Sequence, residues 1–199
     1  MTVNQTKSKV IHFRPNTVPR TEFSFKCGEL NLETVDKYTY LGLVLTEHLD
    51  YLTMAKHVAA AANRALGLLI AKHKAFGGFP FRTFSKLYDS TVWSTINYGA
   101  AIWGDRTFTC INSVQNKASR FFMGVGRYTP NSAVNGDTGW IPADIRQWRT
   151  VISQYYRLKN MDNIRVNHRI YKWADNTCLN SHQCKNWNFR IRQQFNKTV

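Results

Sequence analysis

The feature that most constrains the fold is a change in the spacing of apolar residues near Asp50. Before Asp50, apolar and polar residues alternate, as at Phe23 and Phe25, and this spacing is typical of β-strands. After it, apolar residues recur every three or four positions, as on one face of a helix. The chain is therefore predicted to be α+β, with a small antiparallel β-sheet at the N-terminus followed by a helical bundle and further C-terminal helices.

Three or four antiparallel strands are expected in the N-terminal quarter. The segment Cys27-Gly28-Glu29 separates two alternating stretches and predicts a hairpin. One further continuous strand is expected near Tyr40. Its two faces would carry, on one side, Thr39, Leu41, Leu43 and Leu45 and, on the other, Tyr38, Tyr40 and Val44.

Three helices are expected next, and together they predict a three-helix bundle. The first begins after Asp50, a residue suited to an N-cap, and ends at Gly77-Gly78. The second covers Phe81 to Trp103, and the third runs from about Thr107 to Met123. Glycines and prolines then indicate a loop, so the predicted domains are residues 1–49, 50–125 and 126–199.

The last of these regions is basic and rich in aromatic residues. Stacking of nucleobases on Trp or Tyr is one interpretation, and burial of these rings in a core is the other. We expect most of the rings to be buried, which would leave the arginines for contact. The rings concerned are Trp148, Tyr155, Trp173 and Trp187.

The charge of the chain favours a phosphate-rich partner. Lys and Arg number 27 against 12 Asp and Glu, which gives a net charge of +15. No stretch approaches the roughly 20 apolar residues needed to span a bilayer, and no signal peptide is recognisable. We therefore expect no membrane partner and an intracellular protein, nuclear or cytoplasmic.

Cysteine and histidine spacing does not predict a metal site. The four cysteines are scattered and are expected to be reduced thiols. Zinc ligands are usually separated by two to four residues, whereas five separate Cys178 from Cys184, and His168 is remote from His182. These side chains are expected to be unliganded.

The first predicted helix carries cations and very small side chains opposite its apolar face. The apolar face comprises Met54, Val58, Ala61, Ala65, Leu68 and Leu69. The opposite face comprises Lys56, Ala60, Asn63, Arg64, Gly67, Ala71 and Lys74. A smooth basic surface suits contact with a nucleic-acid backbone without sequence readout. Small residues also allow two helices to pack closely, but the charges favour nucleic acid.

Several motifs occur in an order known from one family of polymerases. The segments Asn4-Gln5-Thr6-Lys7-Ser8-Lys9 and Lys37-Tyr38-Thr39-Tyr40-Leu41-Gly42 resemble motifs D and E of non-LTR (LINE-type) retrotransposon reverse transcriptases. Later segments resemble the thumb of that family, namely Leu87-Tyr88, Ile96 to Gly99, Trp103, Val114 to Ala118, Arg120 to Gly124 and Gly139 to Pro142. The resemblance implies the end of the palm, the thumb and a connector in the three predicted domains.

The resemblance also implies roles for individual residues. Lys7 would be the motif D general acid, although a solvated lysine is the expected state here. Tyr40, Leu41 and Gly42 would form the primer grip, with an ordinary half-buried strand as the equal alternative. Lys117 and Arg120, within the thumb motifs, would join Lys56, Asn63, Arg64 and Lys74 in binding nucleic acid.

Catalysis by this chain alone is not expected. Polymerases of the family hold two metal ions between carboxylates, usually including an Asp-Asp pair, and this sequence has no such pair. We expect no cofactor, with Mg²⁺ only in the full-length parent enzyme. The expected partners are RNA, an RNA–DNA or DNA duplex, and the missing fingers–palm part. The alternative is a helical protein-interaction module or an inert transposon remnant.

Overall fold

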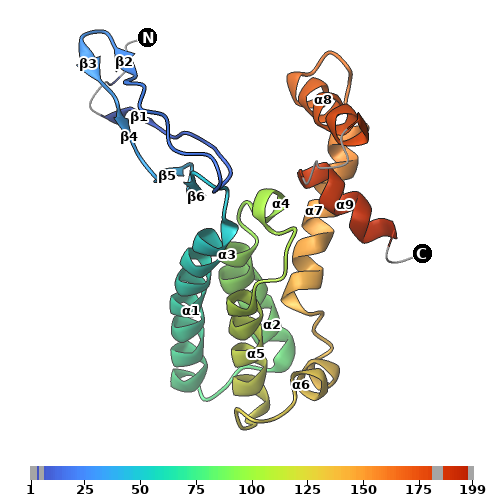
Figure 1. The fold of residues 1–199 in the computed structure, drawn as a ribbon. Coiled ribbons are helices and arrows are strands. Elements are labelled where there is room, and N and C mark those ends of the chain that lie inside the picture. The colour runs from blue at the N-terminus through green and yellow to red at the C-terminus, as the bar shows by residue number, and fades with distance from the viewer. Residues whose placement is uncertain (1–3, 5–6, 181–185, 197–199) are drawn as a thin grey trace. The chain divides into compact units, whose positions relative to one another are not determined.

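The protein is α+β, as expected, with short strands first and helices after them. The computed structural model describes residues 4, 7–180 and 186–196 (Figure 1). They form two compact units, Met1–Val58 and Ala59–Val199. The division falls inside the first helix, and the predicted domain limits after residues 49 and 125 stay predictions.

The N-terminal unit contains three two-stranded sheets. Strand β2 (Lys26–Cys27) pairs with β3 (Leu30–Asn31) in the predicted antiparallel hairpin, and Gly28 has a φ of 63° in its turn. Strand β1 (Lys9–Val10) pairs with β4 (Glu33–Thr34) in a parallel arrangement, which departs from the prediction. The long connection between β1 and β4 makes this possible, because a parallel pair needs a crossover of about a dozen residues or more.

The prediction of one continuous strand around Tyr40 is wrong, because the segment folds into a second hairpin. Strands β5 (Lys37–Tyr40) and β6 (Leu43–Thr46) are antiparallel and are joined at Leu41 and Gly42, whose φ angles are 48° and 76°. Two-residue turns with both φ angles positive match the twist of antiparallel strands, and Gly adopts them without strain. Leu41 thus lies at the tip, 72% exposed, instead of sharing a face with Leu43.

Helix α1 (Tyr51–Ala75) begins and ends as predicted. The Asp50 carboxylate accepts the N–H of Leu52 at 3.0 Å, and Gly77 and Gly78 follow the last turn with positive φ angles. The apolar face differs in part, because Leu68 is 63% exposed and Leu66 is fully buried. Leu66 follows Ala62 by four residues, which keeps it on the buried face. The buried residues of α1 are Met54, Ala55, Val58, Ala59, Ala62, Leu66 and Leu69.

The second predicted helix is broken into several pieces. They are α2 (Phe81–Leu87), the π-helical turn η2 (Tyr88–Trp93), α3 (Ser94–Ile96) and α4 (Ala100–Trp103). Hydroxyl groups of Thr91, Ser94 and Thr95 donate to carbonyl oxygens four residues earlier, which is known to bend helices. Gly99, with a φ of 63°, adopts the left-handed conformation between α3 and α4.

Helix α5 (Thr109–Met123) confirms the third predicted helix and ends at Gly124, with a φ of 66°. Helix α6 (Asn131–Thr138) was not predicted, because the segment around it reads as a loop. The core of this part contains large, fully buried side chains of α2 to α5, namely Phe84, Tyr88, Val92, Ile96, Trp103, Ile111 and Val114.

The last three helices are α7 (Ala143–Lys159), α8 (Val166–Asn180) and α9 (Trp187–Asn196). They enclose a second core of Val151, Tyr155, Tyr171 and Ile191, against which Trp148 and Trp187 pack. Most of the four rings were expected to be buried, and Trp173 is an exposed one, at 69%. It stands two residues after Tyr171 and therefore on the opposite face of α8. Within the described residues, no helix is long and apolar enough to cross a membrane.

Candidate nucleic-acid interface

The outer face of α1 in the second unit brings exposed polar residues and very small side chains together. It comprises Ala60, Asn63, Arg64, Gly67, Ala71 and Lys74. A Cβ atom added at Gly67 would meet nothing within 4 Å. Gly inside a helix costs about 1 kcal/mol relative to Ala, yet no packing partner in the described chain requires Gly67. This disfavours packing against another helix of the described chain as the reason for the small residues and leaves an open surface.

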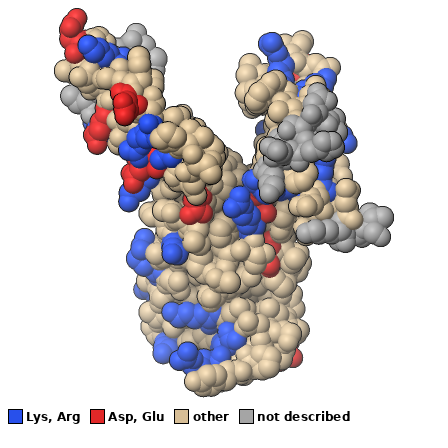
Figure 2. Space-filling view, in the orientation of Figure 1, with Lys and Arg blue, Asp and Glu red and all other residues tan. Residues whose placement is uncertain are grey.

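The positive charges near this face lack acidic partners. No Asp or Glu lies between Asp50 and Asp89, although the segment holds Lys56, Arg64, Lys72, Lys74, Arg82 and Lys86. None of these six cations forms an ion pair with a residue that the structure describes. Figure 2 shows Lys and Arg gathered over the lower part of the helical unit. Solvated helices usually balance such charges one turn away, so this surface retains its attraction for polyanions.

The N-terminal unit holds the predicted primer-grip residues as well as Lys7 and Lys56. Tyr40 and Leu41 are exposed at the β5–β6 turn, and Gly42 completes it, so the structure brings the three predicted primer-grip residues together. Lys7 is exposed near the first strand, and Lys56 is exposed on the first turns of α1.

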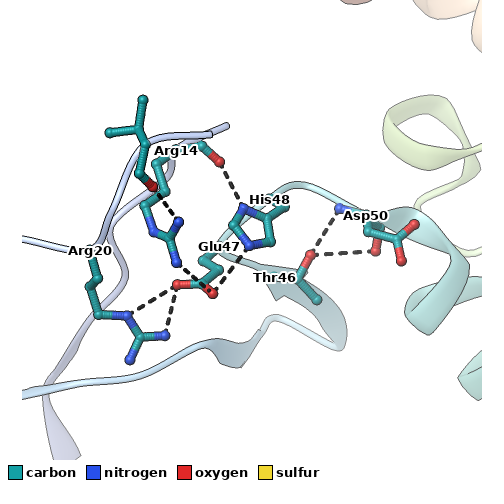
Figure 3. Close-up of polar contacts among 7 residues, drawn as sticks. Arg14, Arg20, Thr46, Glu47, His48 and Asp50 are labelled. Atoms are coloured by element: carbon teal, nitrogen blue, oxygen red, sulfur yellow. Dashed lines mark hydrogen bonds and ion pairs between the residues drawn. The ribbon is translucent and has the colours of Figure 1, made fainter. Parts of the chain in front are cut away.

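Other cations of the N-terminal unit are neutralised by a carboxylate (Figure 3). Glu47 Oε1 lies 3.1 Å from Arg14 and 3.3 Å from His48, and its Oε2 lies 2.7 Å from Arg20. The hydrogen bond from Arg20 lowers the pKa of Glu47 below its ordinary range, and the charge of Arg14 adds to this effect against the influence of burial. This cluster fastens the loop after β1 to the end of β6 and does not present its cations to a ligand.

The two predicted cations of α5 differ in what they contact. Lys117 is exposed. Arg120 is half-buried and donates to the carbonyl oxygen of Thr129 at 2.9 Å and to the side-chain oxygen of Asn131. Arg120 therefore fixes the chain before α6, whereas Lys117 presents its charge to solvent.

Several C-terminal arginines also serve the fold. The guanidinium carbon of Arg146 lies 3.8 Å from the centre of the Trp93 ring, and Arg146 pairs with Asp89 at 2.8 Å. The prediction that these arginines remain available for contact is wrong for this residue and for two others in ion pairs. Those pairs are Arg190 with Asp105 and Arg192 with Asp175.

The residues weighed as zinc ligands do not form a described cluster. His168 is buried, and its Nδ1 lies 2.8 Å from the carbonyl oxygen of Leu158. His182 and Cys184 lie outside the described residues, as does the side chain of Cys178. In the part of the chain that is described, no three His, Cys, Asp or Glu side chains are grouped to hold a metal ion.

Comparison with known proteins finds no family model that matches the chain, and no curated protein or solved structure with significant similarity to it. The candidate interface therefore rests on geometry and charge. On the outer face of α1, the geometry and the charge indicate the same ligand, an extended polyanion.

Proposed function

We propose that this chain binds nucleic acid through the sugar–phosphate backbone, with little sequence preference. The observation that carries the proposal is the outer face of α1, where Arg64 and Lys74 accompany an open Gly67 and no acidic residue intervenes. Cations contact phosphates, and small side chains let the backbone approach. The amide of Asn63 on this face already donates to the carbonyl oxygen of Ala59 at 3.0 Å, which limits its use in reading base edges, so a duplex of any sequence would suit the face.

We propose further that the chain corresponds to the thumb and connector of a non-LTR retrotransposon reverse transcriptase. The order of the motifs supports this, as does the exposed turn at Leu41 and Gly42, which lies where the resemblance implies the primer grip. On this proposal the chain does not polymerise by itself. Polymerisation would need paired carboxylates, with their Mg²⁺, from a fingers–palm part outside these 199 residues.

The salt dependence of binding tests the backbone proposal. Fluorescence anisotropy with a labelled RNA–DNA duplex, repeated over a range of NaCl concentrations, gives the slope of log K against log[salt]. Contact with several phosphates predicts a slope of about −0.9 for each phosphate. A flat salt response would contradict the proposal.

A matched pair of charge variants locates the contact. Arg64→Glu with Lys74→Glu should weaken duplex binding by more than about tenfold, because phosphate contacts are replaced by repulsion. Arg165→Glu with Arg169→Glu changes the net charge equally, on exposed positions at and near the start of α8. Thermal unfolding of both variants checks the fold. Equal losses of affinity would show that total charge alone matters and would exclude α1 as the site.

Exposed apolar residues around α8 support a second function, self-association or binding of another protein. Ile164, Val166, Ile170 and Trp173 are all exposed there. Apolar patches of this kind often mark protein interfaces. Sedimentation velocity over a range of concentrations tests this function. Association that Trp173→Ser abolishes would support it, and a monodisperse monomer would count against it.

A further inference from the structure

A groove between α5, α6 and the start of α7 was missed by sequence patterns, because α6 itself was not predicted. It has a volume of about 480 Å³ and is lined by asparagines of α5 and α6. Asn112 and Asn116 lie one turn apart on α5, and Asn131 and Asn135 lie one turn apart on α6. A second hollow of about 500 Å³ shares Asn116 and Asn131 with the first, so the two are adjacent. Hollows of this size hold small organic groups such as nucleobases.

The asparagine amides retain hydrogen-bonding capacity toward a ligand. The Oδ1 atom of Asn112 accepts the N–H of Asp144 at 3.2 Å, and the Oδ1 atom of Asn131 accepts from Arg120. These contacts orient both amides and leave their NH₂ groups as donors. The Oδ1 atom of Asn135 is buried and has no partner among the described residues.

The second hollow has a basic lining and an aromatic neighbour. Lys117 and Arg127 line it. Tyr128, the next residue, is 89% exposed, and its ring centre lies 5.3 Å from the guanidinium carbon of Arg127. An exposed ring beside a cation is a stacking platform for a nucleobase. Asp144 lines the first hollow and not the second, so no carboxylate lies among the lining residues of the hollow that holds Lys117 and Arg127.

We propose that this groove binds single-stranded nucleic acid. An unpaired base stacks on Tyr128, its phosphates contact Lys117 and Arg127, and the edge of a neighbouring base bonds to the asparagine amides. Bases in a duplex are already stacked and paired, so a single strand alone offers free faces and edges. An extended peptide could also form hydrogen bonds with the amides, but it would not explain why cations lie beside an exposed aromatic ring.

This inference rests on the proposed ligand class, nucleic acid, and adds a second site with a different preference. The experiment compares two labelled probes, an unstructured RNA oligonucleotide and an RNA–DNA duplex of the same length. Tyr128→Ser, and separately Asn116→Ala with Asn135→Ala, should weaken single-strand binding about tenfold and leave duplex binding unchanged. Tyr128→Phe should retain the affinity, because it retains the ring. The variant Arg64→Glu with Lys74→Glu should show the reverse pattern.

Several outcomes would overturn the inference. They are an equal loss on both probes, no loss on the single strand, and displacement of the RNA by oligoglutamate of equal charge as readily as by unlabelled RNA. Displacement by oligoglutamate would indicate that the groove binds an acidic peptide, or that binding depends on charge alone. Unchanged melting temperatures show that the variants fold. Absent duplex binding with Tyr128-dependent single-strand binding would refute the α1 site alone.

Discussion

The guanidinium of Arg120, on α5, donates to the carbonyl oxygen of Thr129 at 2.9 Å, and the same nitrogen also contacts Asn131 at the first residue of α6. One side chain thus joins two helices across the loop that carries Arg127 and Tyr128. The Nε atom of Arg120 is buried without a partner among the described residues, so the contacts of its Nη2 atom hold the guanidinium. The loop conformation depends on this contact.

Replacement of Arg120 by lysine should therefore lower both stability and single-strand affinity. A lysine ammonium is a point charge and does not reproduce the planar set of guanidinium donors. Chemical denaturation should show a loss of about 1–3 kcal/mol in the free energy of unfolding. Lys117→Ala, an exposed position on the same helix, serves as the control and should change stability by less than about 0.5 kcal/mol. An Arg120→Lys protein with unaltered stability would refute this positioning role.

The hydroxyl of Tyr88 should be dispensable for stability. The residue is fully buried, its ring centre lies 4.5 Å from that of Trp140, and its hydroxyl has no partner among the residues described. Burial also raises the pKa of this phenol far above its usual range. Tyr88→Phe keeps the ring and removes the unpaired oxygen, so urea unfolding should show a gain of about 1 kcal/mol. Tyr88→Ala should lose about 3–5 kcal/mol. A destabilised Tyr88→Phe protein would mean that the hydroxyl is satisfied.

The Glu47 cluster should make the N-terminal unit sensitive to acid. The pKa of Glu47 is lowered in the folded state, so its carboxylate binds protons less readily than in the unfolded chain. The stabilisation is therefore complete above the ordinary carboxyl pKa of 4.5 and is lost as pH falls through the lowered value. Thermal unfolding followed from neutral pH to acid should show this loss. Glu47→Gln should weaken the pH dependence, whereas Glu29→Gln, exposed at the β2–β3 turn, should preserve it.

Gly67 should show opposite effects on stability and on binding. Gly67→Ala should raise the free energy of unfolding by about 1 kcal/mol, because Ala favours helix and the added Cβ meets no atom. Gly67→Leu places bulk on the proposed contact surface and should lower duplex affinity without unfolding the protein. Gly136→Leu is the matched control, since a Cβ at this helical position on α6 also meets nothing within 4 Å. Duplex affinity that falls equally in both leucine variants would contradict the proposed role of Gly67.

Local chemistry predicted the elements whose ends are marked in the sequence. Asp50 marks the start of α1, and Gly77 and Gly78 mark its end. Both could be predicted because capping and left-handed turns are local effects. Residue spacing did not predict the β5–β6 turn, because alternating residues look the same in one strand and in a hairpin until Gly42 takes a positive φ, and only the resemblance to motif E implied a hairpin there. The break at Gly99 was also missed, since the helical spacing of apolar residues continues across it.

The candidate site was predictable only where exposure follows from helix spacing. Arg64 and Lys74 lie opposite the buried face of α1, so their exposure could be read from the sequence. The inward contacts of Arg120 could not be read from the sequence. Its partners Thr129 and Asn131 lie in a segment whose glycines and prolines indicated a loop, although the segment contains α6. Long-range partners of this kind have no signal in the spacing of residues.

The pairing of Arg190 with Asp105 joins α9 to the segment between α4 and α5. The Asp105 side chain is completely enclosed, and the two residues are 85 positions apart. An enclosed carboxylate deprived of its counter-ion destabilises a protein by about 3–5 kcal/mol, a large share of what holds a domain folded. Proteolytic removal of α9 should therefore destabilise the segment around Asp105, although the two are far apart in the sequence. A shortened version of the protein should include α9.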